Sequence, residues 1–528
     1  MKLHETETIG GILRSTAAEY ADRIAVIDPS GRYTYAELDH FVDQTAKYLL
    51  SLGVRKGDHV GIWAKDDAMT LIVFFSIWRI GAVAVPLCTS YLKKELEYCC
   101  FAADLQYIVT GIAHKGERFS SHIGVLNSPV QIITVENALP RSFCSVDAPV
   151  AKDALQKAEA AVSPSDADTI LFTSGTTGAV KPVLTTHFSR VNTMYAQAEA
   201  IRAVREDVFC SVLPMYHCFS LTATILPAVS VGACVCFPAD RHSQTILAAV
   251  EQERCTVLNA VPTLFSALLH RLVEQDFDLS SLQKGIIGGS TYSVSFFKKI
   301  SRMFSFTLLS SLGQTEATAG LTATSMDDPL DVRASTIGRF FPLVEGSIRD
   351  VETNEPLGAN QVGEICVRGY NVMQGYYKQP EATAVVIDRD GWLHTGDLGK
   401  QDENGYITYS GRLKELIIRG GENIAPSELE NILSADKRIS QVKVIGVPDR
   451  HYTEEICACI VSDDDTLTAD AVRKLVAANT AYFKVPKYVL FLDQLPMTAV
   501  GKVDLTKLRH TAQELLSKEL ESASLPRF

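Results

Sequence analysis

A run of small residues directly follows a hydrophobic strand pattern about one third of the way along the chain. Thr169–Phe172 has the composition of a buried strand, residues 173–179 are only Thr, Ser, Gly or Ala, and Lys181 closes the run. Glycines and small hydroxyl side chains let a backbone approach an anion closely, and successive N–H groups can surround phosphate oxygens. The run therefore predicts a phosphate-binding loop that follows a strand.

The spacing of this loop differs from the Walker A pattern of P-loop NTPases. Gly175, Gly178 and Lys181 do not form G-x4-G-K-[ST], and Pro182 follows the lysine. A P-loop ATPase is therefore disfavoured. Taken alone, the segment has a flexible Ser/Thr/Gly turn as its alternative interpretation.

Composition and charge restrict the class of protein. The 528 residues predict roughly two to four structural units, and a hydrophobic content of 46% is enough for a large core. The net charge is −12. A nucleic-acid-binding protein would need a concentrated basic surface, so we expect no nucleic-acid partner.

Neither targeting nor membrane insertion is predicted. The first residues show no apolar core after a basic start, so we expect no signal peptide. The hydrophobic stretches 71–87 and 221–237 are interrupted by Arg79 and Pro227, which favours buried helices and strands over membrane spans. The twelve cysteines lack the spacing of zinc ligands, so we interpret them as reduced core thiols in a cytoplasmic protein.

Hydrophobic patterning predicts an α/β fold in several parts. Short apolar runs alternate with longer amphipathic ones to about residue 330, which indicates parallel sheets with helices on both faces. Gly-punctuated strands then predict a β-rich subdomain, and the last part of the chain predicts a small α+β domain. We place the large domain at 1–411, its β-rich subdomain at about 337–411, and the small domain at 412–528.

Two capping boxes predict where helices begin. Thr34–Glu37 precedes a helical apolar pattern that ends at Gly53, and Ser427–Glu430 precedes a helix of the small domain.

Several polar motifs follow the small-residue run, and each is weak when taken alone. Thr315–Glu316 places a hydroxyl beside a carboxylate, a combination that suits Mg²⁺ and a phosphate oxygen. Asp397 lies on a Gly-rich turn, Arg412 follows, and Lys502 lies in a loop before the last helix. A Thr–Glu pair is otherwise mostly a helix cap, and a lysine in a polar loop is usually solvated.

The order and spacing of these motifs resemble those of the adenylate-forming superfamily, which includes acyl- and aryl-CoA synthetases, adenylation domains of peptide synthetases, and beetle luciferases. The resemblance extends from about Tyr33 to Arg509. The run Lys414–Ile424 is most similar to free-standing acyl- and aryl-CoA synthetases.

This resemblance implies a nucleotide site made of several segments. The loop that holds the ATP phosphates would comprise Thr173, Ser174, Gly175, Thr176, Thr177, Gly178 and Lys181. Gly288, Gly289 and Ser290 would line the adenine. Thr315 and Glu316 would contact the α-phosphate and Mg²⁺, with Thr173 as a second metal contact, and Asp397 and Arg412 would hold the ribose.

The resemblance also implies residues for catalysis and for the acyl group. Lys502 would bridge the substrate carboxylate and the α-phosphate, and His217 would form the gate between acid and nucleotide. Phe219, Ala223 and Ser311 would line the acyl pocket. Lys414 would be the hinge of a mobile small domain, and Gly420 and Gly421 would border the tunnel for the thiol of coenzyme A.

Two departures from the family pattern affect the nucleotide site. Pro182 stands where a glycine is usual, and Leu312 replaces the tyrosine that stacks on adenine. Because a base–aromatic stack contributes about 1–3 kcal/mol, Leu312 predicts weaker nucleotide binding than is typical of the family.

The expected activity is activation of a carboxylic acid by ATP and Mg²⁺, followed by transfer to coenzyme A. No basic or acidic side chain in the pocket pairs a second carboxylate or an amino group, so a medium-chain fatty or aromatic monocarboxylic acid is expected. A separate acyl-carrier protein is the alternative acceptor. A luciferase-like oxygenase and a binding protein without turnover are further alternatives.

Overall fold

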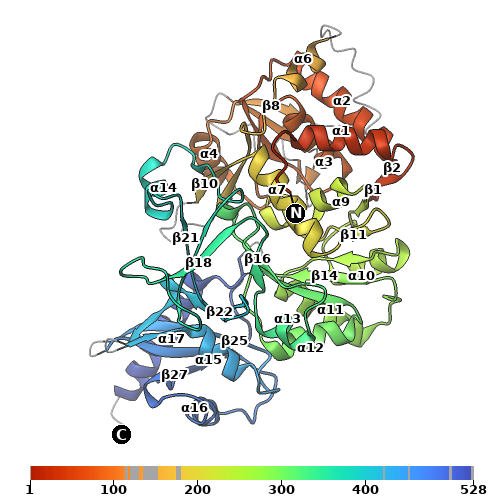
Figure 1. The fold of residues 1–528 in the computed structure, drawn as a ribbon. Coiled ribbons are helices and arrows are strands. Elements are labelled where there is room, and N and C mark those ends of the chain that lie inside the picture. Colours follow the sequence, from red (N-terminus) through yellow and green to blue (C-terminus); the bar gives the residue numbers. More distant parts are fainter. Residues whose placement is uncertain are drawn as a thin grey trace.

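The computed structural model describes residues 2–111, 113–114, 117–118, 130–134, 153–173, 180–419, 422–449, 452–498 and 502–524. Two large sheets that are parallel over most of their width form the first part of the chain, as expected from the sequence. In Figure 1 the strand-rich region and the C-terminal elements, drawn in teal and blue, lie below the first of these sheets. None of the described helices is both long and apolar enough to cross a membrane.

The first sheet carries the strands on either side of the small-residue run. Its order is β20 (Gly375–Tyr376), β10 (Lys181–Thr186), β9 (Ala167–Thr173), β4 (Val83–Pro86), β3 (His59–Trp63), β5 (Tyr107–Thr110) and β8 (Gln131–Thr134). The pairings from β9 to β8 are parallel, whereas β10 is antiparallel to both β9 and β20. The small-residue run thus connects two adjacent antiparallel strands.

The second sheet is parallel in its centre. Its order is β17 (Arg339–Phe340), β16 (Thr322–Ala323), β15 (Thr307–Leu312), β14 (Lys284–Ile287), β13 (Val257–Leu258), β11 (Val208–Cys210), β12 (Cys234–Cys236), β1 (Ile24–Asp28) and β2 (Gly31–Thr34). The strands from β15 to β1 pair in parallel. Parallel strands end at one edge of the sheet, and the residues after β14 and β15 lie there.

Helices connect the strands of the two sheets. They are α1 (Ile9–Glu19), α2 (Tyr35–Ser51), α3 (Ala68–Arg79), α4 (Lys93–Ala102), α6 (Ala154–Ala160), α7 (His187–Ala200), α8 (Cys218–Ser220), the π-helix η2 (Leu221–Ile225), α9 (Leu226–Ser230), α10 (Ser243–Gln252), α11 (Pro262–Glu274), α12 (Val294–Met303), the 3₁₀ turn η3 (Thr315–Ala317) and α13 (Leu330–Ser335). The hydrophobic stretches at 71–87 and 221–237 form buried helices and strands, as predicted.

An antiparallel sheet and a C-terminal α/β unit complete the chain. The sheet has the order β18 (Glu345–Arg349), β19 (Gly363–Arg368), β21 (Leu393–Gln401) and β22 (Ile407–Arg412), with α14 (Pro380–Val386) beside it. The C-terminal sheet contains β24 (Glu422–Ile424), β23 (Ile417–Arg419), β26 (Thr453–Val461), β25 (Gln441–Asp449) and β27 (Tyr488–Phe491). Around it lie η4 (Leu413–Glu415), α15 (Pro426–Leu433), α16 (Ala469–Ala477), η5 (Tyr482–Lys484) and α17 (Leu505–Ser524).

One of the two predicted capping boxes is confirmed and the other is wrong. Thr34 accepts from the Glu37 N–H, and the Glu37 carboxylate accepts from the Thr34 N–H at the start of α2. Ser427 is not a cap, because α15 begins at Pro426 and proline is favoured in the first turn of a helix. The Ser427 hydroxyl instead donates to the Ser410 carbonyl at 2.8 Å and ties α15 to β22.

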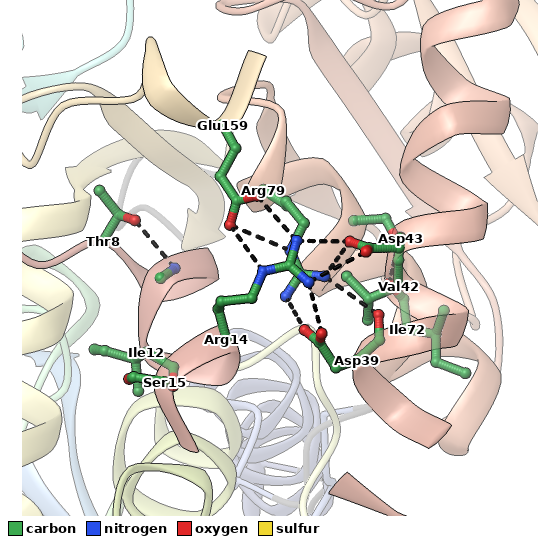
Figure 2. Close-up of polar contacts among 12 residues, drawn as sticks. Thr8, Ile12, Arg14, Ser15, Asp39, Val42, Asp43, Ile72, Arg79 and Glu159 are labelled. Atoms are coloured by element: carbon green, nitrogen blue, oxygen red, sulfur yellow. Dashed lines mark hydrogen bonds and ion pairs between the residues drawn. The ribbon is translucent and has the colours of Figure 1, made fainter. Parts of the chain in front are cut away.

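Two arginines join the N-terminal helices through one charged cluster (Figure 2). The Arg79 side chain on α3 is fully buried and donates to Asp39 at 2.5 Å and to Asp43 at 2.7 Å, both on α2. Arg14 of α1 contacts the same two aspartates and Glu159 of α6. The cluster therefore fixes four helices against one another.

Replacing Arg79 with Met should destabilise the large domain by about 3 kcal/mol, the lower end of the range for a broken buried pair, since it leaves the two partly buried aspartates with Arg14 as their remaining cation in the cluster. The measurement is the free energy of urea unfolding. Arg205→Met is the control, because Arg205 and Glu206 form an exposed pair. Equal stability of the two variants would contradict a structural role for the cluster.

Candidate active site

The ends of β9 and β10 place Thr173 opposite Lys181. The two residues are partners in the antiparallel register, so both ends of the predicted loop lie side by side. The predicted loop residues Ser174, Gly175, Thr176, Thr177 and Gly178 lie outside the described residues.

Glu316 and Lys181 meet at a tyrosine that the sequence analysis missed. Tyr376 of β20 donates its hydroxyl to Glu316 Oε1 at 2.9 Å, and Lys181 Nζ lies 4.7 Å from the centroid of the same ring. Burial, together with the Glu316 charge, raises the pKa of Tyr376. The sequence shows Gly375 and Tyr376 but does not show which strand they pair with. Only the pairing of β20 with β10 brings Tyr376 close to Lys181.

Asp397 lies in β21 with one carboxylate oxygen engaged and the other available. Its Oδ1 accepts from Arg412 Nε at 2.9 Å and from the Tyr409 hydroxyl at 3.4 Å. Its Oδ2 is buried and has no hydrogen-bond partner among the described residues. Burial raises the pKa of this carboxyl despite Arg412. Because an unpaired buried acceptor is costly, Oδ2 suits a ligand hydroxyl.

The turn before Asp397 is held by Glu364, a second residue that the sequence analysis missed. Glu364 Oε1 accepts from the Gly396 N–H at 2.7 Å, and its Oε2 pairs with His394 Nδ1 at 2.8 Å. Together with Cys366, these side chains place possible metal-ligand atoms within 4.8 Å of one another. His394 Nε2 also faces Asp388 at 3.5 Å, so the imidazole already has a carboxylate at each nitrogen. We interpret the cluster as support for the Asp397 turn.

Gly288, which follows β14, lies against two predicted acyl-pocket residues, Ser311 of β15 and Phe219 of α8. A Cβ added to Gly288 would lie 2.8 Å from the Ser311 carbonyl oxygen and 3.7 Å from Phe219 Cε1, so any side chain at Gly288 would clash. Ala223 is buried within the π-helix η2 but belongs to none of the apolar core clusters of the described chain. The Asn259 amide donates to the Ala223 carbonyl at 2.7 Å and fixes this turn. π-helical turns are frequent at functional sites.

The predicted gate residue His217 lies beside a cysteine that contacts the predicted α-phosphate residue Thr315. Cys218, next to His217, has its Sγ 3.6 Å from the hydroxyl of Thr315. Burial, and then the charge of Lys502, lower the pKa of His217 to about 4. His217 Nε2 is buried without a hydrogen-bond partner in the described structure. The imidazole is therefore neutral at physiological pH.

Lys502 reaches this site from the C-terminal unit. Thr498 and Lys502 close their loop with two hydrogen bonds, from the Thr498 N–H to the Lys502 carbonyl at 2.7 Å and from the Lys502 N–H to the Thr498 hydroxyl at 3.2 Å. The residue is exposed by surface area, yet desolvation by surrounding protein and the charge of Arg412 lower the pKa of its ammonium group. Asp397 and Glu316 counteract this effect. Lys502 thus shares its electrostatic environment with the predicted ribose and metal residues.

A buried ion pair connects the β9–β10 hairpin to the acyl side. Arg190 of α7 pairs with Asp168 of β9, and neither side chain is exposed. Arg190 also donates to Thr185 of β10 at 2.7 Å and to Thr222 of η2 at 2.8 Å. Burial opposes ionisation of Asp168, but the charge of Arg190 outweighs it and lowers the pKa of this carboxyl. One guanidinium thus fixes the hairpin relative to the π-helix.

The structure also describes three other predicted site residues, Gly289, Ser290 and Lys414. Gly289 lies beside Val261, and Ser290 is exposed. Lys414 lies in η4, immediately after β22. Gly420 and Gly421 lie outside the described residues.

The residues that are present fit a magnesium nucleotide. Asp397 Oδ2 offers a hydrogen-bond acceptor, Glu316 offers the carboxylate oxygens that Mg²⁺ prefers, and Lys181 and Lys502 offer positive charge. His217 is neutral, and the residues around Gly288 and Ala223 are small or apolar.

Comparison with protein families finds two matches in chain order. The model of the AMP-binding enzyme family matches residues 13–377, and the model of the AMP-binding enzyme C-terminal domain matches residues 428–502.

Known proteins similar to the chain over nearly its full length are acyl-CoA synthetases and ligases. YngI of Bacillus subtilis, named provisionally as an acyl-CoA synthetase, is 37% identical over 97% of this chain and 98% of its own. The mitochondrial medium-chain acyl-CoA ligase of Rattus norvegicus is 30% identical over 97% of this chain and 88% of its own. The ATP-bound crystal structure of MatB from Rhodopseudomonas palustris is 27% identical, with a TM-score of 0.83 over 96% of this chain and 100% of its own.

The electrostatic contact between Lys502 and His217 can be tested in solution. In Lys502→Ala the pKa of His217 should rise above about 4 without reaching 6.5, because the cation is lost while burial, the larger cause, persists. Imidazole NMR signals titrated with pH, assigned with His217→Asn, give the measurement. His187, whose pKa is also about 4 but for which Lys502 is not a cause, is the internal control. An unchanged His217 pKa would show that the Lys502 loop does not occupy this site in solution.

Proposed function

Because the chain belongs to the family of AMP-binding enzymes, we propose that it activates an apolar monocarboxylic acid with ATP and transfers the acyl group to coenzyme A. The family assignment makes it an AMP-forming acid–thiol ligase. The acid and the acceptor are the proposed part.

The observation that carries the proposal is the convergence of Lys502 with Glu316, Asp397 and Arg412. Lys502 comes from the C-terminal unit, whereas the other three come from η3, β21 and β22. Carboxylate activation by ATP brings several anionic groups together, so its catalysis consists mainly of positioning and charge neutralisation. Lys502 and Arg412 supply positive charge, and Asp397 supplies a buried carboxylate for the ribose. This combination supports such a step.

In the first step a carboxylate oxygen of the acid attacks the α-phosphorus of ATP. A carboxylate–phosphorus bond forms, the bond from the α-phosphorus to the bridging oxygen of pyrophosphate breaks, and pyrophosphate leaves with the electron pair. Lys502 neutralises charge between the carboxylate and the α-phosphate, and Thr315 donates to the α-phosphate. Glu316 and Thr173 would hold Mg²⁺, which supplies further charge neutralisation when bound. Asp397 binds the ribose hydroxyls and Lys181 the terminal phosphates.

In the second step the thiolate of coenzyme A attacks the acyl carbonyl, a thioester forms, and AMP leaves with the bonding electrons. We propose that the small domain, residues 412–528, rotates about Lys414 between the two steps. Rotation would remove Lys502 and bring Gly420 and Gly421 to border the thiol path. Glycines suit that position, since a side chain would narrow the path. Lid-type motions of this kind often limit turnover.

The acyl pocket supports an apolar monocarboxylic acid of medium chain or aromatic type. Gly288, Ala223 and Phe219 offer no charge to a second carboxylate or an amino group, and burial of an unpaired charge is costly. The names of the similar ligases support medium-chain fatty acids among these.

A reducing compartment, the cytoplasm, is proposed as the location. All cysteines of the described chain are free, and most are buried.

Carboxylate-dependent ATP–pyrophosphate exchange across a panel of acids tests the function. Exchange with a fatty or aromatic acid, followed by thioester formation when coenzyme A is added, is expected. Exchange without a thioester would favour an acyl-carrier protein as acceptor. Absence of exchange with every acid would favour a binding protein.

Lys502→Ala should lower pyrophosphate exchange by at least about a hundredfold while largely sparing thioester formation from a preformed acyl-adenylate. The reason is that loss of a charge contact in the transition state, worth about 3 kcal/mol, affects only the step in which it acts. Both half-reactions are measured separately. Lys507→Ala, an exposed lysine on α17, is the control. Equal losses in both half-reactions would refute the assigned role.

Ala223→Leu should reduce kcat/KM for long or wide acids by about tenfold or more, and for short acids much less, because it adds bulk to the proposed acyl pocket. The measurement is kcat/KM across acids of increasing length. Ala228→Leu, equally buried on α9 but part of an apolar core cluster, controls for overpacking. A uniform loss across acids would place the acyl group elsewhere.

A further inference from the structure

We propose that Tyr376 is a positioning residue that keeps Glu316 and Lys181 apart and orients both for a magnesium nucleotide. The inference rests on the proposed function, and it assigns a role to a side chain outside the polar motifs of the sequence. Tyr376 does not react, and it acts through the two charged groups that it touches.

The tyrosine contacts both charges through different parts of its ring. Its hydroxyl donates to Glu316 Oε1 at 2.9 Å, and its ring face lies 4.7 Å from Lys181 Nζ. The cation–π contact keeps the ammonium group at a fixed place without neutralising it. Lys181 makes no ion pair with a carboxylate in the part of the chain that the structure describes.

The backbone around Tyr376 is tied to the same elements. Tyr376 pairs with Val183 of β10, two residues after Lys181. The Met373 N–H donates to the Glu316 carbonyl at 2.9 Å, and the Thr318 hydroxyl donates to the Asn371 carbonyl at 2.8 Å. The segment 371–376 therefore spans from the phosphate hairpin to η3, and the tyrosine ring has little freedom.

Two opposite charges near one another would otherwise form an ion pair. Such a pair would occupy the carboxylate needed for Mg²⁺ and the ammonium group needed for phosphate. The hydrogen bond from Tyr376 also selects one oxygen of Glu316 and fixes the carboxylate plane. Removal of the hydroxyl should therefore shift the Mg²⁺ dependence of nucleotide binding to higher Mg²⁺ concentrations and leave the fold unchanged.

The chain offers a matched control in the next residue. Tyr377 donates its hydroxyl to Asp104 at 2.9 Å and has Lys378 Nζ 5.7 Å from its ring centroid. The two sites differ in one respect, because Lys378 also forms a direct ion pair with Asp104, whereas Lys181 has no carboxylate partner among the described residues. Tyr376→Phe and Tyr377→Phe each remove a hydroxyl that donates to a carboxylate, so Tyr377→Phe controls for loss of such a hydrogen bond outside the proposed site.

The experiment measures stabilisation of the full chain by ATP as a function of Mg²⁺ concentration, without acid, by thermal shift. Because a hydrogen bond to a charged group is lost, Tyr376→Phe should need roughly three- to tenfold more Mg²⁺ for half-maximal stabilisation. Tyr377→Phe should match the wild type. The same shift in Mg²⁺ dependence is expected in pyrophosphate exchange, with the KM for the acid unchanged.

A double variant shows whether the tyrosine acts through the carboxylate. In the Glu316→Gln background, Tyr376→Phe should change the Mg²⁺ dependence no further. An unshifted Mg²⁺ dependence in Tyr376→Phe, or equal shifts in both tyrosine variants, would overturn the proposal. So would an additive effect of Tyr376→Phe on Glu316→Gln. If Tyr376→Phe alone fails to fold, Tyr376 is a core residue and the proposal is wrong.

The readouts separate this inference from the proposed function. Absence of exchange with every acid refutes the function, whereas the Mg²⁺-dependent stabilisation by ATP still tests Tyr376. Exchange with unaltered Mg²⁺ dependence in Tyr376→Phe refutes the inference and leaves the function standing.

Discussion

The buried pair between Arg190 and Asp168 is the interaction on which the geometry of the site depends. Arg190 is fully buried and makes three contacts, to β9 through Asp168, to β10 through Thr185 and to the π-helix through Thr222. A buried pair of this kind adds little net stability, but removal of one partner leaves an uncompensated charge. The two strands that flank the predicted phosphate loop and the turn that carries Ala223 are therefore fixed relative to one another. On the proposed mechanism, this spacing brings the acid and the phosphates together beside His217.

A second constraint is that side chains that bind a ligand must not use up their hydrogen bonds and charges on one another. Asp397 keeps one buried oxygen without a partner, although Arg412 and Tyr409 occupy the other. Glu364 anchors the preceding turn through the Gly396 N–H, so Asp397 cannot relax toward solvent. An acceptor without a hydrogen bond lowers the stability of the fold, and the rigid strands offset this loss. A ligand hydroxyl that bonds to the acceptor removes the loss, which makes binding more favourable. Preorganisation thus comes from the antiparallel sheet rather than from the residues that contact the nucleotide.

Sequence reasoning predicted those parts of the candidate site that are local in the chain. Thr315, Glu316, Asp397 and Arg412 belong to short motifs on strand ends and turns, where local spacing determines the chemistry. The roles of Tyr376 and Glu364 depend on which strands pair, and no local pattern encodes the pairing of β20 with β10. Ser427 failed as a predicted cap because Pro426 sets the start of α15 and the serine hydroxyl bonds to β22. A serine that bonds to a distant strand cannot also cap its own helix. The tertiary contact therefore determines which hydrogen bond forms.

Because Lys502 lies near Arg412, the charge of the bound substrate should affect the position of the small domain. Desolvation by the surrounding protein, and then the charge of Arg412, lower the pKa of Lys502, so the Lys502 ammonium group is disfavoured at this position when no phosphate is present. On the proposed mechanism, a bound triphosphate adds negative charge beside Lys502 and favours this pose. Departure of pyrophosphate removes most of that charge, so the ammonium group is again disfavoured while the acyl-adenylate stays bound. A ligand can shift a conformational equilibrium only if it binds the two states with different affinity. Here the proposed difference in affinity is electrostatic. On the proposed mechanism, loss of pyrophosphate would itself release the Lys502 loop and clear the path for the thiol.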